Sequence, residues 1–95
     1  ALKDYTSAAT SLEKAQALDP SPANTANFGA ALYSVGRYSD AEKVLSQAVS
    51  LDAKNAVAWY NLGLTLKSLS RDAEAKRAWQ RSADLGYAPA RDLLR

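Results

Sequence analysis

The chain has 95 residues, of which 47% are hydrophobic, and its formal net charge is only +2. This length suits one domain with a modest core, and so slight a charge gives no reason to expect a nucleic-acid partner. Because the chain has no cysteine and no histidine, it offers no disulfide and no sign of a bound metal or cofactor, and its apolar runs are too short for membrane insertion.

Apolar residues recur at spacings of three and four along most of the chain, which predicts five helices. Their expected ranges are 3–17, 22–35, 38–51, 56–70 and 72–84. Proline is tolerated in the first turn of a helix, so Pro22 suits the start of the second helix and Pro89 the start of a further short one. The turns at 35–37 and 69–71 are short, so the helices on either side of each must pack antiparallel. The sequence therefore predicts an all-α chain of about five helices plus a short C-terminal helix.

The sequence also repeats itself with a period of 33 to 34 residues. Residues 38–48 align with residues 5–15 at an offset of 33, and Trp79 aligns with Leu45 at an offset of 34. A period of this length indicates a helix pair that is repeated and stacked. We therefore expect a single domain over 1–95, in which 1–21 supplies the second helix of a partial unit, 22–55 and 56–88 are full units, and 89–95 begins a capping helix.

Small residues occupy the positions at which two helices of a unit must approach each other closely. These are Gly29 and Gly63 on the first helices and Ala41 and Ala75 on the second helices. A larger side chain at any of them would hold the pair apart. One unit cannot bury both of its faces, so the units must stack. The large residues expected to fill the core are Phe28, Leu32, Leu45, Leu62, Leu66 and Trp79.

The third unit contains Trp59-Tyr60-Asn61-Leu62-Gly63 and then Ala75 and Trp79, and the second unit contains Phe28-Gly29 at the matching place. These residues resemble the tetratricopeptide repeat family, whose motif has Trp, Leu-Gly three residues later, then Tyr, and in the second helix Ala, Phe and a closing Pro. The resemblance implies a right-handed superhelical α-solenoid of antiparallel helix pairs. The departures from the motif are Leu32 and Leu66 for the aromatic residue, Ala53 and Tyr87 for the closing proline, and Ser82 for an alanine.

No arrangement of residues indicates catalysis. A nucleophile needs an adjacent base, and the chain has neither histidine nor cysteine to serve. The carboxylates of Asp40 and Glu42 lie two residues apart on one helix and therefore point in different directions. The glycines are isolated from one another, so no loop that would hold phosphates is encoded. We therefore expect the chain not to be an enzyme.

The family resemblance implies a binding surface, because first helices of successive tetratricopeptide units line a groove that holds a peptide. Asn27 and Asn61 are equivalent by repeat spacing, and an asparagine there could bond both the N–H and the C=O of an extended peptide. Tyr33 and Tyr60 would supply apolar walls. The alternative is that these are ordinary solvated helix residues. The residues expected to line the groove are Asn27, Tyr33, Tyr60, Asn61, Leu64, Lys67, Arg91 and Arg95.

Positive charge gathers toward the C-terminal end. Residues 56–95 carry seven Lys or Arg against four Asp or Glu, whereas residues 1–55 carry five against six. Some members of the family grip the terminal carboxylate of a chaperone tail, and Asn61, Arg91 and Arg95 match three of the five positions that do so. Ala26 and Ala30 occupy the other two positions. Such a carboxylate clamp is therefore a minor alternative.

The chain starts partway through a unit, so we expect it to be part of a larger protein. The incomplete first unit would leave Leu12 without a full cover, and such an end can stack on further repeats or on a second copy. Two hypotheses therefore lead. Either the chain binds a peptide or partner protein in its concave groove, or it is a scaffold or oligomerisation segment that stacks through its solenoid ends.

Overall fold

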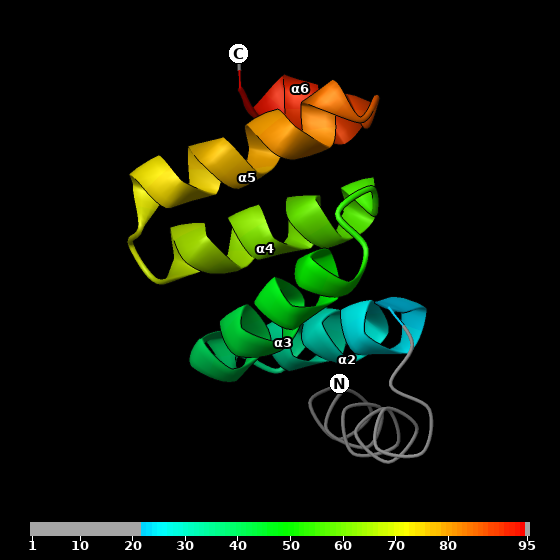
Figure 1. Ribbon diagram of the computed structural model, residues 1–95. Coiled ribbons are helices and arrows are strands. Elements are labelled where there is room, and N and C mark those ends of the chain that lie inside the picture. The colour runs from blue at the N-terminus through cyan, green and yellow to red at the C-terminus, as the bar shows by residue number, and fades with distance from the viewer. Residues whose placement is uncertain (1–21, 95) are drawn as a thin grey trace.

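The computed structural model describes residues 22–94. The expected helix over 3–17, with Leu12, lies outside the described residues, as does Arg95. The described part contains five helices and no strand, so the predicted all-α helical repeat is confirmed (Figure 1). The helices are α2 (Pro22–Ser34), α3 (Tyr38–Leu51), α4 (Ala56–Ser68), α5 (Asp72–Asp84) and α6 (Ala88–Leu93).

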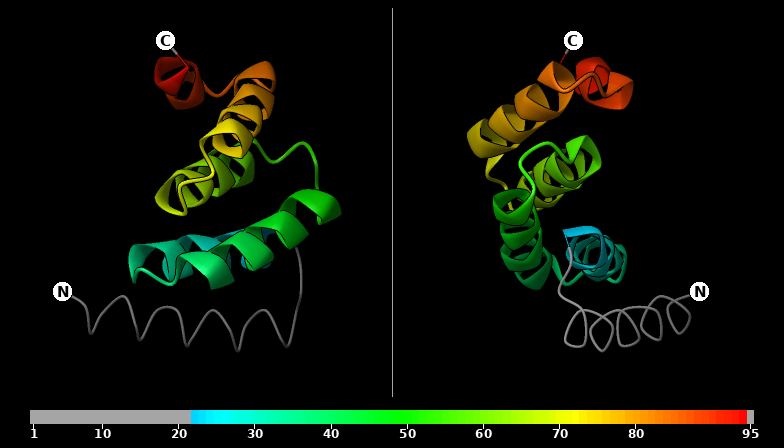
Figure 2. Two further views of the ribbon diagram at one scale, coloured as in Figure 1. Left: turned by 90° about the vertical axis from the view of Figure 1, so that its left-hand side faces the viewer. Right: turned by 45° about the vertical axis from the view of Figure 1, so that its right-hand side comes forward.

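The helices pack in chain order as two antiparallel pairs. The most extensive contacts join α2 to α3 and α4 to α5, which are the two predicted units. The units join through α3 against α4, and α6 packs against α5. Figure 2 shows the two pairs stacked one on the other. The first helices α2 and α4 also contact each other, so residues at equivalent positions of the two units lie on neighbouring helices.

Both short turns within the units contain a residue in the left-handed backbone region. Gly36 has a φ of 85°, and the N–H of Arg37 then donates to the carbonyl of Leu32 at 2.9 Å. Ser70 occupies the equivalent place with a φ of 63°, and the N–H of Arg71 donates to the carbonyl of Leu66, also at 2.9 Å. This closure satisfies carbonyls at the helix ends. It also ends α2 one residue, and α4 two residues, before the predicted ends at 35 and 70.

The loop between the units is held by two side-chain hydrogen bonds. The side chain of Asn55 accepts from the N–H of Ala58 at 3.1 Å and so caps the start of α4. The indole Nε1 of Trp59 donates to the carbonyl of Ala53 at 2.8 Å. Trp59 therefore fixes the loop to the helix that follows it.

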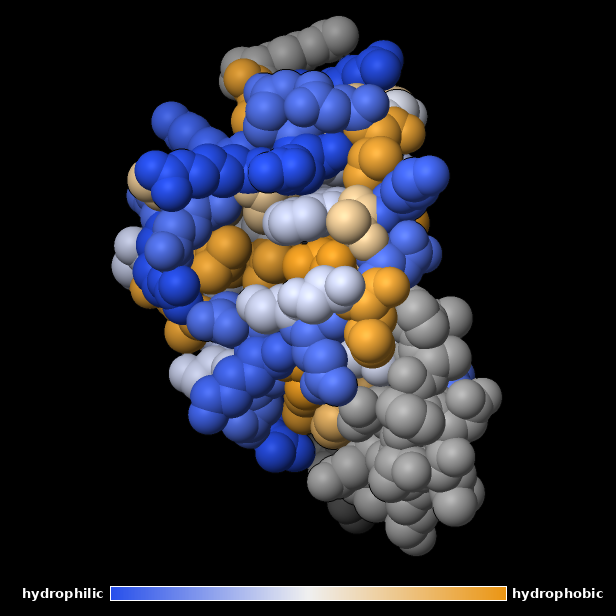
Figure 3. All heavy atoms as spheres, in the orientation of Figure 1, coloured by the Kyte–Doolittle hydropathy of each residue, from blue (hydrophilic) through white to orange (hydrophobic). Residues whose placement is uncertain are grey.

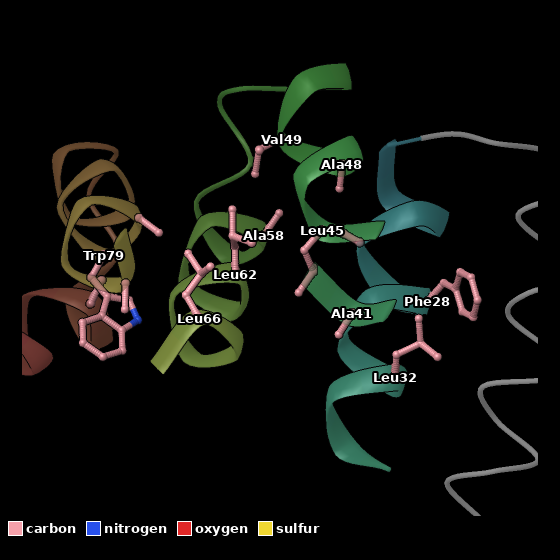
Figure 4. Packing of buried hydrophobic residues seen from close by; sticks show 14 of the residues in the cluster. Phe28, Leu32, Ala41, Leu45, Ala48, Val49, Ala58, Leu62, Leu66 and Trp79 are labelled. Carbon is pink, nitrogen blue, oxygen red and sulfur yellow. The ribbon is translucent and has the colours of Figure 1, made fainter. Parts of the chain in front are cut away.

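The buried side chains form one cluster that runs from α2 through α3 and α4 to α5 (Figure 4). Every large residue predicted for the core is buried, and the predicted small residues Ala41 and Ala75 have no exposed surface. Burying a side chain of this size stabilises the fold by roughly 1.5–3 kcal/mol. The confirmed large core residues are Phe28, Leu32, Leu45, Leu62, Leu66 and Trp79.

The two glycines of the first helices lie where the partner helix approaches most closely, as predicted. A Cβ on Gly29 would lie 2.5 Å from Cγ of Leu45, and a Cβ on Gly63 would overlap the indole of Trp79, with Cε2 at 2.9 Å. The buried indole N–H of Trp79 has no hydrogen-bond partner among residues 22–94. Gly63 therefore makes room for a ring that is larger than the leucine of the preceding unit.

Ser82 explains one departure from the motif. Its hydroxyl is buried and donates to the carbonyl of Ala56 at 2.7 Å, which ties the end of α5 to the start of α4. An alanine at this position would fill nearly the same space but could not form the bond.

Candidate functional site

The first helices present two equivalent asparagines. Asn27 on α2 is exposed and Asn61 on α4 is half-buried, one repeat of 34 residues apart. The main-chain carbonyl of Asn61 accepts a hydrogen bond from the Thr65 hydroxyl at 2.8 Å. Neither side-chain amide bonds to another residue in the part of the chain that the structure describes. Both amides therefore keep their donors and acceptors for solvent or a ligand.

An aromatic pair borders Asn61. The ring of Tyr60 packs edge-on against that of Tyr87, with centroids 5.2 Å apart and an interplanar angle of 66°. Tyr87 is the residue before α6, and Leu64 lies half-buried one turn further along α4. Tyr87 is not among the residues that the sequence predicts for binding. The available signal was an aromatic residue where the motif has its closing proline.

Tyr33 and Lys67 occupy equivalent positions at the ends of α2 and α4, and each contacts the second helix of its own unit. The ring of Tyr33 lies 5.4 Å from that of Tyr38, whereas Nζ of Lys67 lies 3.4 Å from a carboxylate oxygen of Asp72. Both side chains of the ion pair are more than half exposed. Such pairs stabilise little, so a partner could displace Asp72.

The other residues considered for the carboxylate clamp lie on α6, on α2 or outside the described residues. Arg91 is exposed on α6 and lines a pocket of about 500 Å³ with four other residues, which do not include Asn61. Ala26 is buried and Ala30 half-buried on α2. Arg95 falls outside the described residues. The other residues that line the pocket with Arg91 are Gln80, Ala83, Asp84 and Leu94.

The charged network of the described part centres on Arg71, which precedes α5. Its guanidinium donates to the carboxylate of Glu74 and, at 2.7 Å, to that of Glu42 on α3. The hydrogen bond from Arg71 lowers the pKa of Glu74 below its usual value, and the two carboxylates, Glu74 before Glu42, raise the pKa of Arg71. Arg37 is the equivalent residue of the preceding unit, and it pairs with Asp40 at 2.9 Å in the same i,i+3 arrangement.

Residues 22–94 contain neither a cluster of metal ligands nor a membrane-spanning helix. No three side chains of the His, Cys, Asp and Glu types gather closely enough there to hold a metal ion. None of the helices in that range has the length and apolar character needed to cross a membrane.

Comparison with known proteins agrees with the repeat read from the sequence. A family model described as TPR repeat matches residues 29–70, and a second, described as Tetratricopeptide repeat, matches residues 56–85. No curated protein matches the chain. Repeats of this kind generally mediate protein–protein interaction and are typically non-catalytic. The two matches together cover residues 29–85, and the chain belongs to the tetratricopeptide repeat family.

Proposed function

We propose that the chain binds an extended peptide segment of a partner protein along the face formed by α2, α4 and the start of α6. The observation that carries this proposal is the pair of unengaged side-chain amides, Asn27 and Asn61, on neighbouring first helices. Packed helices lie about 8–10 Å apart, and an extended peptide advances about 3.3 Å per residue. The two amides would therefore meet peptide groups about three residues apart, which fixes register without reading side chains.

The surroundings of Asn61 support an apolar contribution to this binding. Tyr60, Tyr87 and Leu64 are each half-buried, so they have apolar surface left to offer a ligand. The Tyr60–Tyr87 contact holds both rings before a ligand arrives, which lowers the entropy lost on binding. Lys67 adds a cation at the end of α4.

The test is a selection of peptides from a displayed random library on the 95-residue chain, followed by fluorescence anisotropy with the selected peptides. Asn61→Ala and Asn27→Ala should each weaken binding by about fivefold or more, since each removes hydrogen bonds to the peptide backbone. Gln47→Ala, which removes an exposed amide on α3, is the matched control and should leave affinity unchanged. Equal affinity of all three variants would show that the asparagines take no part.

Two further measurements separate the alternatives. Amidating the peptide C-terminus should not change affinity if the backbone is read, whereas a loss that is matched by Arg91→Gln and Arg95→Gln would favour the carboxylate clamp. The scaffold alternative requires oligomers in size-exclusion chromatography with light scattering. If Leu12→Asp dissolves such oligomers while peptide capture is unchanged, the solenoid end is a separate functional surface.

A further inference from the structure

The second helices, α3 and α5, border a pocket that is separate from the proposed groove. It measures about 310 Å³ and lies between α3 and α5, with residues of α4 between them. Its apolar lining comes from Trp59, Leu62, Leu66 and Ala78. The face drawn in Figure 3 has hydrophobic surface between hydrophilic side chains above and below it. None of the expected groove residues is among those that line this pocket.

The charges at its rim do not cancel. Arg71 is paired with both Glu42 and Glu74, which accounts for both carboxylates that line the pocket. Arg77 and Arg81 also line it, and neither forms an ion pair with another residue within 22–94. They are four residues apart on α5, so both lie on the same face of the helix. Arg77 interacts electrostatically with Glu74, which Arg71 already binds, so the three exposed guanidinium groups of the rim face only two carboxylates.

One of these cations is already held in place. The guanidinium carbon of Arg81 lies 5.7 Å from the centroid of the Trp59 ring, close enough for a cation–π contact. The ring is itself fixed, because its N–H donates to the carbonyl of Ala53. A guanidinium that contacts a ring through its face keeps its in-plane N–H groups, which suit the two oxygens of a carboxylate.

We propose that this pocket is a second peptide-binding site, which accepts a segment with an acidic residue next to a large apolar residue. The carboxylate would pair with Arg77 and Arg81, and the apolar side chain would lie on Leu62 and Leu66. A volume near the lower end of the range for ligand pockets holds one or two side chains. The partner is therefore a short acidic and apolar peptide motif, bound on the side of the second helices independently of the groove.

The experiment uses a fluorescein-labelled octapeptide that alternates Glu and Leu and has blocked ends. Matched peptides alternate Gln with Leu and Glu with Ser, so that one lacks the charge and the other the apolar side chains. Only the Glu–Leu peptide should bind. A two-dimensional ¹H–¹⁵N spectrum locates it, because the chain has two tryptophans and only Trp59 lines the pocket. Its indole signal should shift, while the side-chain amide of Asn61 should not.

Two variants test the residues named. Arg77→Gln with Arg81→Gln should weaken the Glu–Leu peptide by about tenfold or more. The control is Lys43→Gln with Lys76→Gln, which removes the same charge from exposed positions of α3 and α5 outside the pocket and should change affinity by less than about twofold. Ser46→Phe fills the pocket from α3 without a change of charge and should also abolish binding.

Several results would overturn the proposal. These are no binding of the Glu–Leu peptide, equal binding of the Gln–Leu peptide, equal effects of the two double variants, and equal binding of a single-stranded oligonucleotide. A shift at Asn61 without one at Trp59 would assign the peptide to the groove instead. Because Asn61→Ala tests the groove separately, each of the two sites can fail without the other.

Discussion

Arg71 donates a hydrogen bond from Nη1 to the carboxylate of Glu42, which lies 29 residues earlier and in the preceding unit. The same guanidinium also donates to Glu74 at the start of its own helix. One side chain therefore links α3 to α5 across the boundary between units. The equivalent Arg37 pairs only with Asp40 of its own helix among the described residues.

The first prediction concerns the acid sensitivity of this link. The pKa of Glu74 is lowered in the folded chain by the hydrogen bond from Arg71, whereas in the unfolded chain it returns to about 4.3. The stability that Glu74 contributes is therefore full above its unfolded pKa and is lost as the pH falls through the lower folded pKa. Thermal unfolding followed by circular dichroism from about pH 7 to about pH 3 should show a shallower acid decline for Glu74→Gln than for the parent chain.

Arg71→Gln provides the complementary variant. It removes the donor that chiefly lowers the pKa of Glu74, so its acid decline should be shallower than that of the parent chain and approach that of Glu74→Gln, because only the smaller effect of Arg77 remains. An Arg71→Gln profile that keeps the steep decline of the parent chain would contradict this account.

A second prediction follows from the close approach at Gly63. Gly63→Ala places a methyl group against the rigid indole of Trp79, so it should destabilise the chain by about 1–3 kcal/mol despite the better helix propensity of alanine. Gly29→Ala should cost less, because it meets a leucine side chain, which is smaller and less rigid than an indole. Chemical denaturation measures both. If Trp79→Leu does not reduce the cost of Gly63→Ala, the indole is not the obstacle.

A third prediction concerns a substitution toward the family motif. Ser82→Ala restores the motif residue but removes the hydrogen bond from Ser82 to the carbonyl of Ala56. We expect a loss of about 1 kcal/mol in the free energy of unfolding, typical of one hydrogen bond. Ala48→Ser, at the equivalent buried position of the preceding unit, is the comparison. A gain in stability for Ser82→Ala would show that the bond contributes nothing.

The fourth prediction concerns the left-handed turn residues. Ser70 has a φ of 63°, a conformation that costs a residue with a Cβ about 1–2 kcal/mol and glycine much less. Ser70→Gly should therefore raise the free energy of unfolding by about 1 kcal/mol. Gly36→Ser makes the reverse exchange at the equivalent position and should lower it by a similar amount. Changes of the same sign in the two variants would contradict the argument.

Most of the fold could be predicted because the same pattern of core residues occurs in both units. The alignment of Gly29 with Gly63 and of Leu45 with Trp79 follows from the period alone, and the contacts between these residues follow from helix geometry. The predicted helix ends near Val35 and Ser70 were too late, because apolar periodicity does not show where the backbone turns left-handed. Gly36 is a visible signal for such a turn, but Ser70 is not.

The pocket on the second helices could not be predicted in the same way. Arg77 and Arg81 read as solvated surface when α5 is considered by itself. Their relation to Trp59 and Leu62 depends on the angle at which α5 crosses α4, and the pairing of Arg71 with Glu42 depends on how one unit sits on the next. Neither the crossing angle nor the stacking of the units can be predicted from a local sequence pattern. Asn27 and Asn61, in contrast, could be chosen from the period, and their role in binding stays a prediction.

The exchange of Tyr33 and Tyr38 for Lys67 and Asp72 means that the two units differ in their response to salt. Raised ionic strength screens the attraction between Lys67 and Asp72, which are exposed, but hardly affects the contact between two aromatic rings. The contact between the end of α4 and the start of α5 that Lys67 and Asp72 form therefore weakens as salt rises, whereas the equivalent contact between Tyr33 and Tyr38 does not. Two units with the same backbone arrangement therefore differ in the salt dependence of this one contact, because the side chains at two equivalent positions differ.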